Sequence, residues 1–205
     1  MNRLLEIFVV LIAAPVWLAL LPVVWLATRA LLGTPVFFGQ VRAGRGGRPF
    51  RIVKFRSMTD ARDAGGRLLP DALRLTRAGR AMRALRLDEL PQLFAILRGD
   101  MALVGPRPLL PQTVEGFGAR GRLRGSVRPG LTGWAQVSGN TALTDAEKLD
   151  LDLWYVAHRS LALDLRILGE TIAVAAFGER RRADRIAAAA RWAECSGPPV
   201  AAGLA

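Results

Sequence analysis

Two adjacent carboxylates, Asp88 and Glu89, stand in the stretch RALRLDELPQLFAIL, with arginines before them and Pro91 after them. Two adjacent acids can act as general acid and general base, because repulsion between them lets one hold a proton at a pH where the other is ionised. One of them can instead attack a phosphorus atom, or the pair can hold a divalent metal ion. Nearby arginines would bind phosphate oxygens and keep Asp88 ionised.

The element that must position the two acids is a helix. Apolar residues recur at helical spacing and Gly99 provides a stop, which predicts a helix over most of Asp88 to Arg98. Pro91 lacks an amide hydrogen, so it fits only in the first turn, and the helix should begin near Leu87. Acids in a first turn often only offset the helix dipole, so this interpretation of the pair stays open.

Further basic residues surround this stretch. Arg107 lies between Pro106 and Pro108, whose rings restrict the backbone around a guanidinium suited to bidentate phosphate contacts, although a solvated Arg107 is equally compatible. Arginines also recur every three residues from residue 74 to residue 86, which predicts a solvated or head-group-facing stripe for most of them. Arg83 and Arg86 are exceptions, because they adjoin the carboxylates.

Composition narrows the class of partner. The chain has 205 residues, 51% hydrophobic and 22% charged, with a net charge of +12, so we expect a membrane-attached protein with a basic soluble part. Such a charge favours nucleic acid, lipid head groups or phosphorylated small molecules. The single Cys195 and single His158 exclude an intrachain disulfide, a cysteine-based metal site and a multi-histidine metal site.

An uncharged apolar segment runs from Ile7 to Thr28, about the length that crosses a membrane as a helix. A cleaved signal peptide is disfavoured, because the segment is long and lacks a clear cleavage site. Pro15 and Pro22 favour a kink. Positive charge stands on both sides of the segment, as in Arg3 before it, so a helix that bends and returns to the same face is as compatible as a straight span.

The rest of the chain divides into recognisable elements. Strands are expected at about 36–41 and 50–55, joined by a glycine-rich turn. Trp134 has the character of a core residue rather than of a base-stacking surface. Two apolar helices should follow, separated near AHRS, and then a basic helix and a flexible end.

Four stretches together resemble one family, the bacterial sugar transferases, which are monotopic phosphoglycosyl transferases that begin glycan assembly on a polyprenol phosphate. The stretches are PVFFGQVRAGRGGRPFRIVKFRSM, LRLDELPQLFAILRGDMALVGPRPLL, VRPGLTGWAQVSG and EKLDLDLWYVAHRSLALDLRIL. They occur in the family's order and cover roughly residues 3 to 172. The chain resembles the small members, which have one membrane segment.

This resemblance implies a reaction. Asp88 would attack the β-phosphate of a UDP-sugar, release UMP and form a phosphosugar-aspartyl intermediate, which undecaprenyl phosphate would then accept. Glu89 would assist by acid/base work or metal placement, with Mg²⁺ held by Asp88 and Glu89. The resemblance also implies phosphate-binding cations at Lys54, Arg56, Arg83 and Arg107.

The resemblance also implies an architecture. We expect a mostly helical α+β fold with a re-entrant helix-break-helix bent at Ala14 and Pro15, a short β-hairpin and interfacial amphipathic helices. The expected parts are a membrane-embedded segment (1–32), a catalytic domain (33–178), and a basic helix with a flexible tail (179–205). The catalytic domain would lie on the cytoplasmic face of the bacterial inner membrane. Its partners would be the donor, the acceptor, membrane lipid and downstream glycosyltransferases of the pathway, but not nucleic acid.

The sequence departs from the family after WAQVSG, where relatives often have an arginine and an asparagine and this chain has Asn140 and Thr141. The donor sugar therefore does not follow from the resemblance, and neither do the pathway and the oligomeric state. Ala14 also replaces a frequent serine, so the bend should rest on Pro15 and packing. Two other hypotheses stay open: a membrane-tethered basic module without catalysis, and a transferase that passes the sugar without its phosphate.

Overall fold

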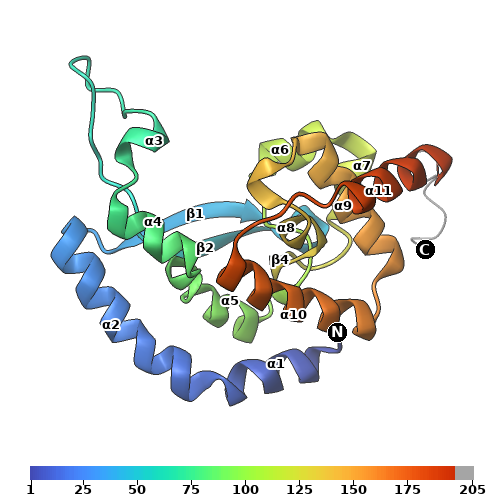
Figure 1. The fold of residues 1–205 in the computed structure, drawn as a ribbon, viewed down its shortest axis with the longest axis horizontal. Helices are drawn as coiled ribbons and strands as arrows, with labels where there is room; N and C mark the ends of the chain where they lie inside the picture. The colour runs from blue at the N-terminus through green and yellow to red at the C-terminus, as the bar shows by residue number, and fades with distance from the viewer. Residues whose placement is uncertain (197–205) are drawn as a thin grey trace.

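The computed structural model describes residues 1–196 as a mostly helical α+β fold, which confirms the predicted class (Figure 1). The flexible end was predicted from Cys195 onward; Cys195 and Ser196 instead belong to the last helix, and 197–205 lies outside the described residues. The helices are α1 (Arg3–Ile12), α2 (Ala14–Leu32), α3 (Asp71–Arg74), α4 (Arg77–Ala84), α5 (Gln92–Arg98), α6 (Pro111–Gly116), α7 (Gly118–Arg124), α8 (Trp134–Val137), α9 (Asp145–His158), α10 (Leu161–Phe177) and α11 (Ala183–Ser196).

Helices α1 and α2 form a bent arm along one edge of the body (Figure 1). The break falls at Ala13, one residue before the predicted pair, because Pro15 stands in the first turn of α2, where its missing amide hydrogen costs nothing. Pro22 is accommodated inside α2. Within residues 1–196, α2 is the helix that is long and apolar enough to cross a membrane, judged by length and composition alone.

The predicted hairpin is present. Strand β1 (Phe37–Ala43) pairs antiparallel with β2 (Pro49–Phe55), within two residues of the expected bounds. A smaller parallel pair joins β3 (Ala102–Val104) to β4 (Gly130–Thr132). A Cβ added at Gly130 would lie 2.1 Å from the amide nitrogen of Gly105, so this close crossing requires glycine.

The predicted helix around the acid pair is divided in two. Leu87–Glu89 form a 3₁₀ turn, and α5 begins only at Gln92, so Asp88 and Glu89 precede the α-helix rather than occupy its first turn. Pro91 cannot donate to the Leu87 carbonyl, which instead accepts from the amide of Leu90 at 3.3 Å. Gly99 ends α5 in the left-handed conformation, as its predicted stop requires.

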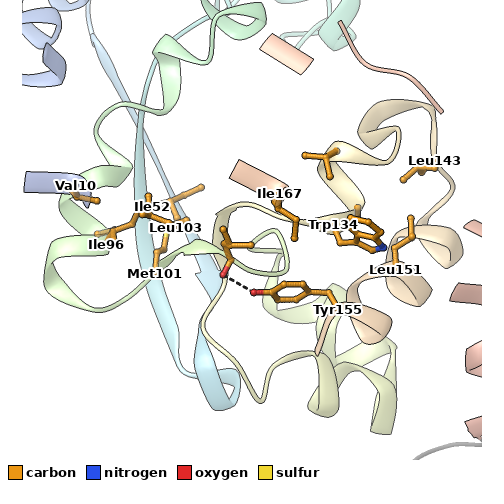
Figure 2. Packing of buried hydrophobic residues seen from close by; sticks show 14 of the residues in the cluster. Val10, Ile52, Ile96, Met101, Leu103, Trp134, Leu143, Leu151, Tyr155 and Ile167 are labelled. Carbon is orange, nitrogen blue, oxygen red and sulfur yellow. Dashed lines mark hydrogen bonds between the residues drawn. The ribbon is translucent and has the colours of Figure 1, made fainter. Parts of the chain in front are cut away.

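One large apolar core joins the arm to the body. Figure 2 shows its side chains, which come from α1 (Val10), β2 (Ile52), α5 (Ile96), β3 (Leu103) and the C-terminal helices. Trp134 is 5% exposed in this core, so the prediction of a core role is confirmed. A second cluster packs α2 against the hairpin and α4; its buried members are Val24, Val36, Phe55 and Met82.

The three C-terminal helices follow the predicted order. A capping box of Thr144 and Glu147 begins α9, and the chain breaks after His158 as expected near AHRS. Helix α11 packs against α9, but it begins only at Ala183, so Arg180, Arg181 and Arg182 of the expected basic helix precede it. Helix α10 leaves large apolar side chains exposed; they are Leu161, Leu165, Ile172 and Phe177.

Candidate active site

The 3₁₀ turn places Asp88 and Glu89 in the interior, with exposures of only 7% and 6%. Arg86 precedes the turn in the left-handed conformation, with φ of 57°. This conformation is unfavourable for a residue with a Cβ, and it redirects the chain from α4 into the turn. Two buried acids on a constrained turn need neighbouring cations to offset their charge.

Glu89 has such partners. Its Oε1 accepts from Lys54 Nζ at 2.6 Å and from Arg107 at 3.0 Å, while Arg86 lies 3.5 Å from Oε2. Burial by itself would raise the pKa of Glu89, but Arg107, Lys54 and Arg86 outweigh it and lower the pKa to about 2. Glu89 is therefore ionised at neutral pH, with its oxygens engaged by protein cations.

Asp88 differs from its neighbour. Among residues 1–196, its carboxylate has no hydrogen bond and no ion pair within 4.0 Å. Burial and the adjacent Glu89 raise the pKa of Asp88, while Lys54, Arg83 and Arg107 lower it only in part. The environment thus shifts the two pKa values in opposite directions and leaves the Asp88 oxygens available to react.

Arg83 is held by Ser57, two residues after the end of β2. Its Nε donates to Ser57 Oγ at 2.9 Å, and its charge lowers the pKa of Asp88. Arg56 instead donates to Asp60 at 3.0 Å and to the carbonyl of Leu32. Of the predicted phosphate-binding cations, Lys54, Arg83 and Arg107 thus act on the acid pair, whereas Arg56 contacts the arm, and its phosphate role stays a prediction.

A buried ion pair supports Arg107. Arg124 donates to Asp152 at 2.8 Å and to the main-chain carbonyl of Arg107 at 2.5 Å, and the side chains of Arg124 and Asp152 are 6% and 4% exposed. Sequence reasoning missed this pair. Its members are 28 positions apart, and no local pattern joins α7 to α9.

A second unpredicted network reaches the turn from the C-terminal side. The Glu179 carboxylate accepts from Asn140 and from both the amide (3.1 Å) and the hydroxyl (2.6 Å) of Thr141. It also lies 4.0 Å from Arg86, whose other contact is Glu89. Glu179 therefore ties the loop that departs from the family pattern to the residue preceding the acid pair.

The acid pair fits Mg²⁺ only together with a substrate. Within residues 1–196 no group of three or more potential metal ligands occurs, but Mg²⁺ commonly uses one or two carboxylates plus substrate phosphates. The unpartnered oxygens of Asp88 are suited to this arrangement. The oxygens of Glu89 are partly occupied by cations, so Glu89 would be the weaker of the two predicted ligands.

Comparison with known proteins decides the family. The sequence profile described as bacterial sugar transferase matches residues 1–178. The chain belongs to the bacterial sugar transferase family. Bacillus subtilis has a relative named uncharacterized sugar transferase EpsL that is 51% identical over 144 residues, or 70% of this chain and 71% of that protein.

Other relatives of this sugar transferase have more specific names. UDP-N-acetylgalactosamine-undecaprenyl-phosphate N-acetylgalactosaminephosphotransferase of Aeromonas hydrophila is 40% identical over 194 residues, 87% of this chain but only 45% of that protein. UDP-glucose:undecaprenyl-phosphate glucose-1-phosphate transferase of Caulobacter vibrioides is 38% identical over 186 residues, 83% of this chain and 68% of that protein. The predicted family and the prediction of an enzyme of the phosphoglycosyl transferase class are confirmed.

Proposed function

We propose that this sugar transferase transfers a phosphosugar from a UDP-sugar to undecaprenyl phosphate and releases UMP. The observation that carries the proposal is the contrast within the acid pair: Asp88 is buried without a partner, while Glu89 is held by Lys54, Arg107 and Arg86. Relatives named undecaprenyl-phosphate sugar phosphotransferases support the choice of acceptor and reaction. Exopolysaccharide production proteins among the relatives support a role early in glycan synthesis.

The reaction would proceed in two displacements at phosphorus, in which Asp88 and Glu89 have different roles. An Asp88 oxygen attacks the phosphorus that bears the sugar, and the bond from that phosphorus to the bridging oxygen breaks, so that UMP leaves with the electron pair. An oxygen of the acceptor phosphate then attacks the same phosphorus, which frees the Asp88 carboxylate and leaves a polyprenyl-diphosphate sugar. Glu89 fixes Lys54 and Arg107, which stabilise charge on the phosphoryl oxygens during both displacements.

Mg²⁺ would be held by Asp88 and Glu89 together with the donor's diphosphate oxygens. When bound, it would supply positive charge that offsets the repulsion between the donor and the two carboxylates. The charge of Arg83 also lowers the pKa of Asp88 and so favours the ionised nucleophile. The constrained 3₁₀ turn keeps both acids in place while the phosphoryl group is transferred.

An apolar pocket is the proposed entry for the acceptor's isoprenoid chain. It has a volume of about 430 Å³ and lies between the membrane helix α2, the hairpin and α5. Its wall includes Pro91, which follows the acid pair by two residues, and Val53 of β2. An apolar chain in this pocket would therefore bring its phosphate towards the catalytic turn. The other lining residues are Leu21, Pro22, Trp25, Phe37, Phe55, Phe94, Ala95 and Arg98.

The arm supports attachment to one face of the bacterial inner membrane. Its beginning contacts the body, because Arg3 donates to the Leu97 carbonyl at 3.0 Å and Glu6 lies 3.1 Å from Arg128. Its end does too, through Arg56 and the Leu32 carbonyl. A re-entrant arm keeps both ends on the cytoplasmic side together with the catalytic body, and the exposed apolar face of α10 would rest on the same membrane surface.

A donor panel tests the proposed function. Purified protein in lipid receives undecaprenyl phosphate, Mg²⁺ and each of a set of UDP-sugars, and the nucleotide product is identified. We expect UMP from at least one donor and none from Asp88→Asn. UDP as the product would instead indicate transfer of the sugar alone. A failure of every donor, or normal turnover by Asp88→Asn, would favour the basic module without catalysis.

A further inference from the structure

Arg42 lies on the same face of the hairpin as Lys54. In the register of β1 and β2, Phe38 is opposite Lys54, Gln40 opposite Ile52 and Arg42 opposite Phe50. Directly opposed residues share a face, and alternate residues along a strand return to it. The side chains of Gln40, Arg42 and Lys54 therefore project towards the same side of the hairpin.

The end of β1 lies beside the segment that carries Arg107. The Ala43 amide donates to the Leu109 carbonyl at 2.9 Å, which fixes Arg42 next to the Pro106–Pro108 segment. Burial, and then the charge of Arg107, lower the pKa of Arg42. Arg42 thus adds a further cation to the side of the site where Arg107 contacts Glu89.

The charge of Arg42 is not offset by the protein. Among residues 1–196 no carboxylate lies within 4.0 Å of its guanidinium, whereas Lys54 and Arg107 both contact Glu89. One terminal nitrogen of Arg42 donates to Gln40 Oε1 at 2.5 Å, and its Nε is buried without a hydrogen-bond partner. A partly buried cation beside another cation is unfavourable unless an anion joins them.

We propose that Arg42, oriented by Gln40, binds the diphosphate of the nucleotide-sugar donor alongside Arg107. This inference rests on the proposed function, because it assigns a further residue that binds the donor at the same site. A guanidinium can hold two phosphate oxygens at once, and a diphosphate would supply Arg42 with the negative charge that no carboxylate of the described residues provides. Two other phosphates have the same chemistry, those of the acceptor and of membrane lipid head groups, and the test must separate them.

The test measures binding of UDP to the full-length protein in neutral-lipid nanodiscs. We expect Arg42→Gln to weaken UDP binding about 10- to 100-fold, the loss typical of a charge-assisted contact. Arg42→Lys keeps the charge but not the bidentate geometry, so its loss should be smaller. Arg51→Gln is the matched control: Arg51 is exposed on the opposite face of the same hairpin, and its removal should leave UDP affinity unchanged.

Further measurements show whether Arg42 binds the phosphates of the donor, of the acceptor or of membrane lipids. Unchanged UDP affinity in both Arg42 variants would overturn the proposal. So would Arg42→Gln raising only the KM for undecaprenyl phosphate, or weakening only the binding of protein to anionic vesicles, without a change in UDP affinity. A UDP-induced rise in Tm that disappears in Arg42→Gln, whose Tm without UDP stays at the wild-type value, would support it. If the wild type binds no UDP, the proposed function itself fails, which is a distinguishable result.

Discussion

Arg107 and Lys54 converge on a single oxygen of Glu89, at 3.0 and 2.6 Å. The carboxylate of Glu89 therefore serves as an anchor for two cations, while the adjacent Asp88 has none of these contacts. Two neighbouring acids of similar burial thus have different electrostatic surroundings. This difference supports our proposal that Asp88 attacks the phosphorus and that Glu89 positions the cations.

Substitution of each acid by its amide should separate these roles. Glu89→Gln should slow turnover roughly 10²- to 10³-fold and raise the KM for the donor, because Lys54 and Arg107 lose their shared anchor. It should still form the phosphosugar adduct, visible as a mass increase of the intact protein. Asp88→Asn should lose at least about 10³-fold in activity and form no adduct. An adduct on Asp88→Asn would reverse the assignment.

The protonation of Asp88 should depend on Arg83. Burial and Glu89 raise its pKa above the ordinary value of 3.8, so the nucleophile loses its charge, and the enzyme its activity, as the pH falls through this raised pKa. Arg83→Gln removes an attractive cation and should raise the pKa further. Carboxyl ¹³C NMR of metal-free protein, with Asp88→Asn to assign the signal, measures it. Arg80→Gln removes one charge from the same helix and should leave the titration of Asp88 unchanged.

The Arg124–Asp152 pair should have two effects that can be measured separately: it stabilises the fold, and it positions Arg107. Asp152→Ala leaves a buried guanidinium unpaired and should lower the free energy of unfolding by about 3–5 kcal/mol. Arg124→Met combined with Asp152→Leu should recover most of this stability, since apolar replacements fill a buried pair well. The KM of this double variant for the donor should nevertheless exceed the wild-type value, because no side chain holds the carbonyl of Arg107. Full activity of the double variant would show that the pair serves stability alone.

Gly79 should be intolerant of any side chain. A Cβ at this position would lie 1.8 Å from the Ser57 carbonyl oxygen, which would force α4 away from the residues after β2. Gly79→Ala should cost roughly 1–3 kcal/mol of stability and reduce activity, because Ser57 holds Arg83. Gly116→Ala is the control, since its Cβ meets nothing within 4 Å. Thermal unfolding and UMP release, measured on both variants, check the prediction.

Sequence could predict what depends on neighbouring residues. Pro91 predicted a helix that begins near Leu87, but only a 3₁₀ turn begins there and the α-helix starts at Gln92, because Pro91 has no amide hydrogen to donate to the Leu87 carbonyl. The family resemblance implied that Arg56 would join Lys54 among the phosphate-binding cations. β2 ends at Phe55, so Arg56 leaves the sheet and contacts the arm.

The parts that sequence did not predict are contacts between distant elements. Arg124 and Asp152 look like ordinary surface charges in their helices, and only packing of α7 against α9 buries them. Glu179 likewise belongs to a basic stretch whose pairing with Thr141 depends on how α10 ends. The residues of such pairs are far apart in the sequence, so neither a periodic pattern nor a local spacing predicts their contact.

The topology of the arm can be tested by cysteine accessibility. In a Cys195→Ser background, which removes the exposed free thiol, Asn2→Cys and Arg45→Cys should react with an impermeant maleimide from the same side of the membrane. Ala13→Cys stands at the break of the arm and should be protected from both sides.

Same-side labelling is expected because both ends of the arm are bound to the catalytic body. A straight span would move α1 to the opposite face and break the contact of Glu6 with Arg128 as well as that of Arg3 with the Leu97 carbonyl. Glu6 would then keep only Arg3 of its own helix as a partner, at 3.5 Å, and a carboxylate with so little compensation is costly in a membrane. Labelling from opposite faces would therefore refute both the re-entrant arm and the docking of α1, whereas Arg128→Gln should increase the fraction of molecules labelled that way.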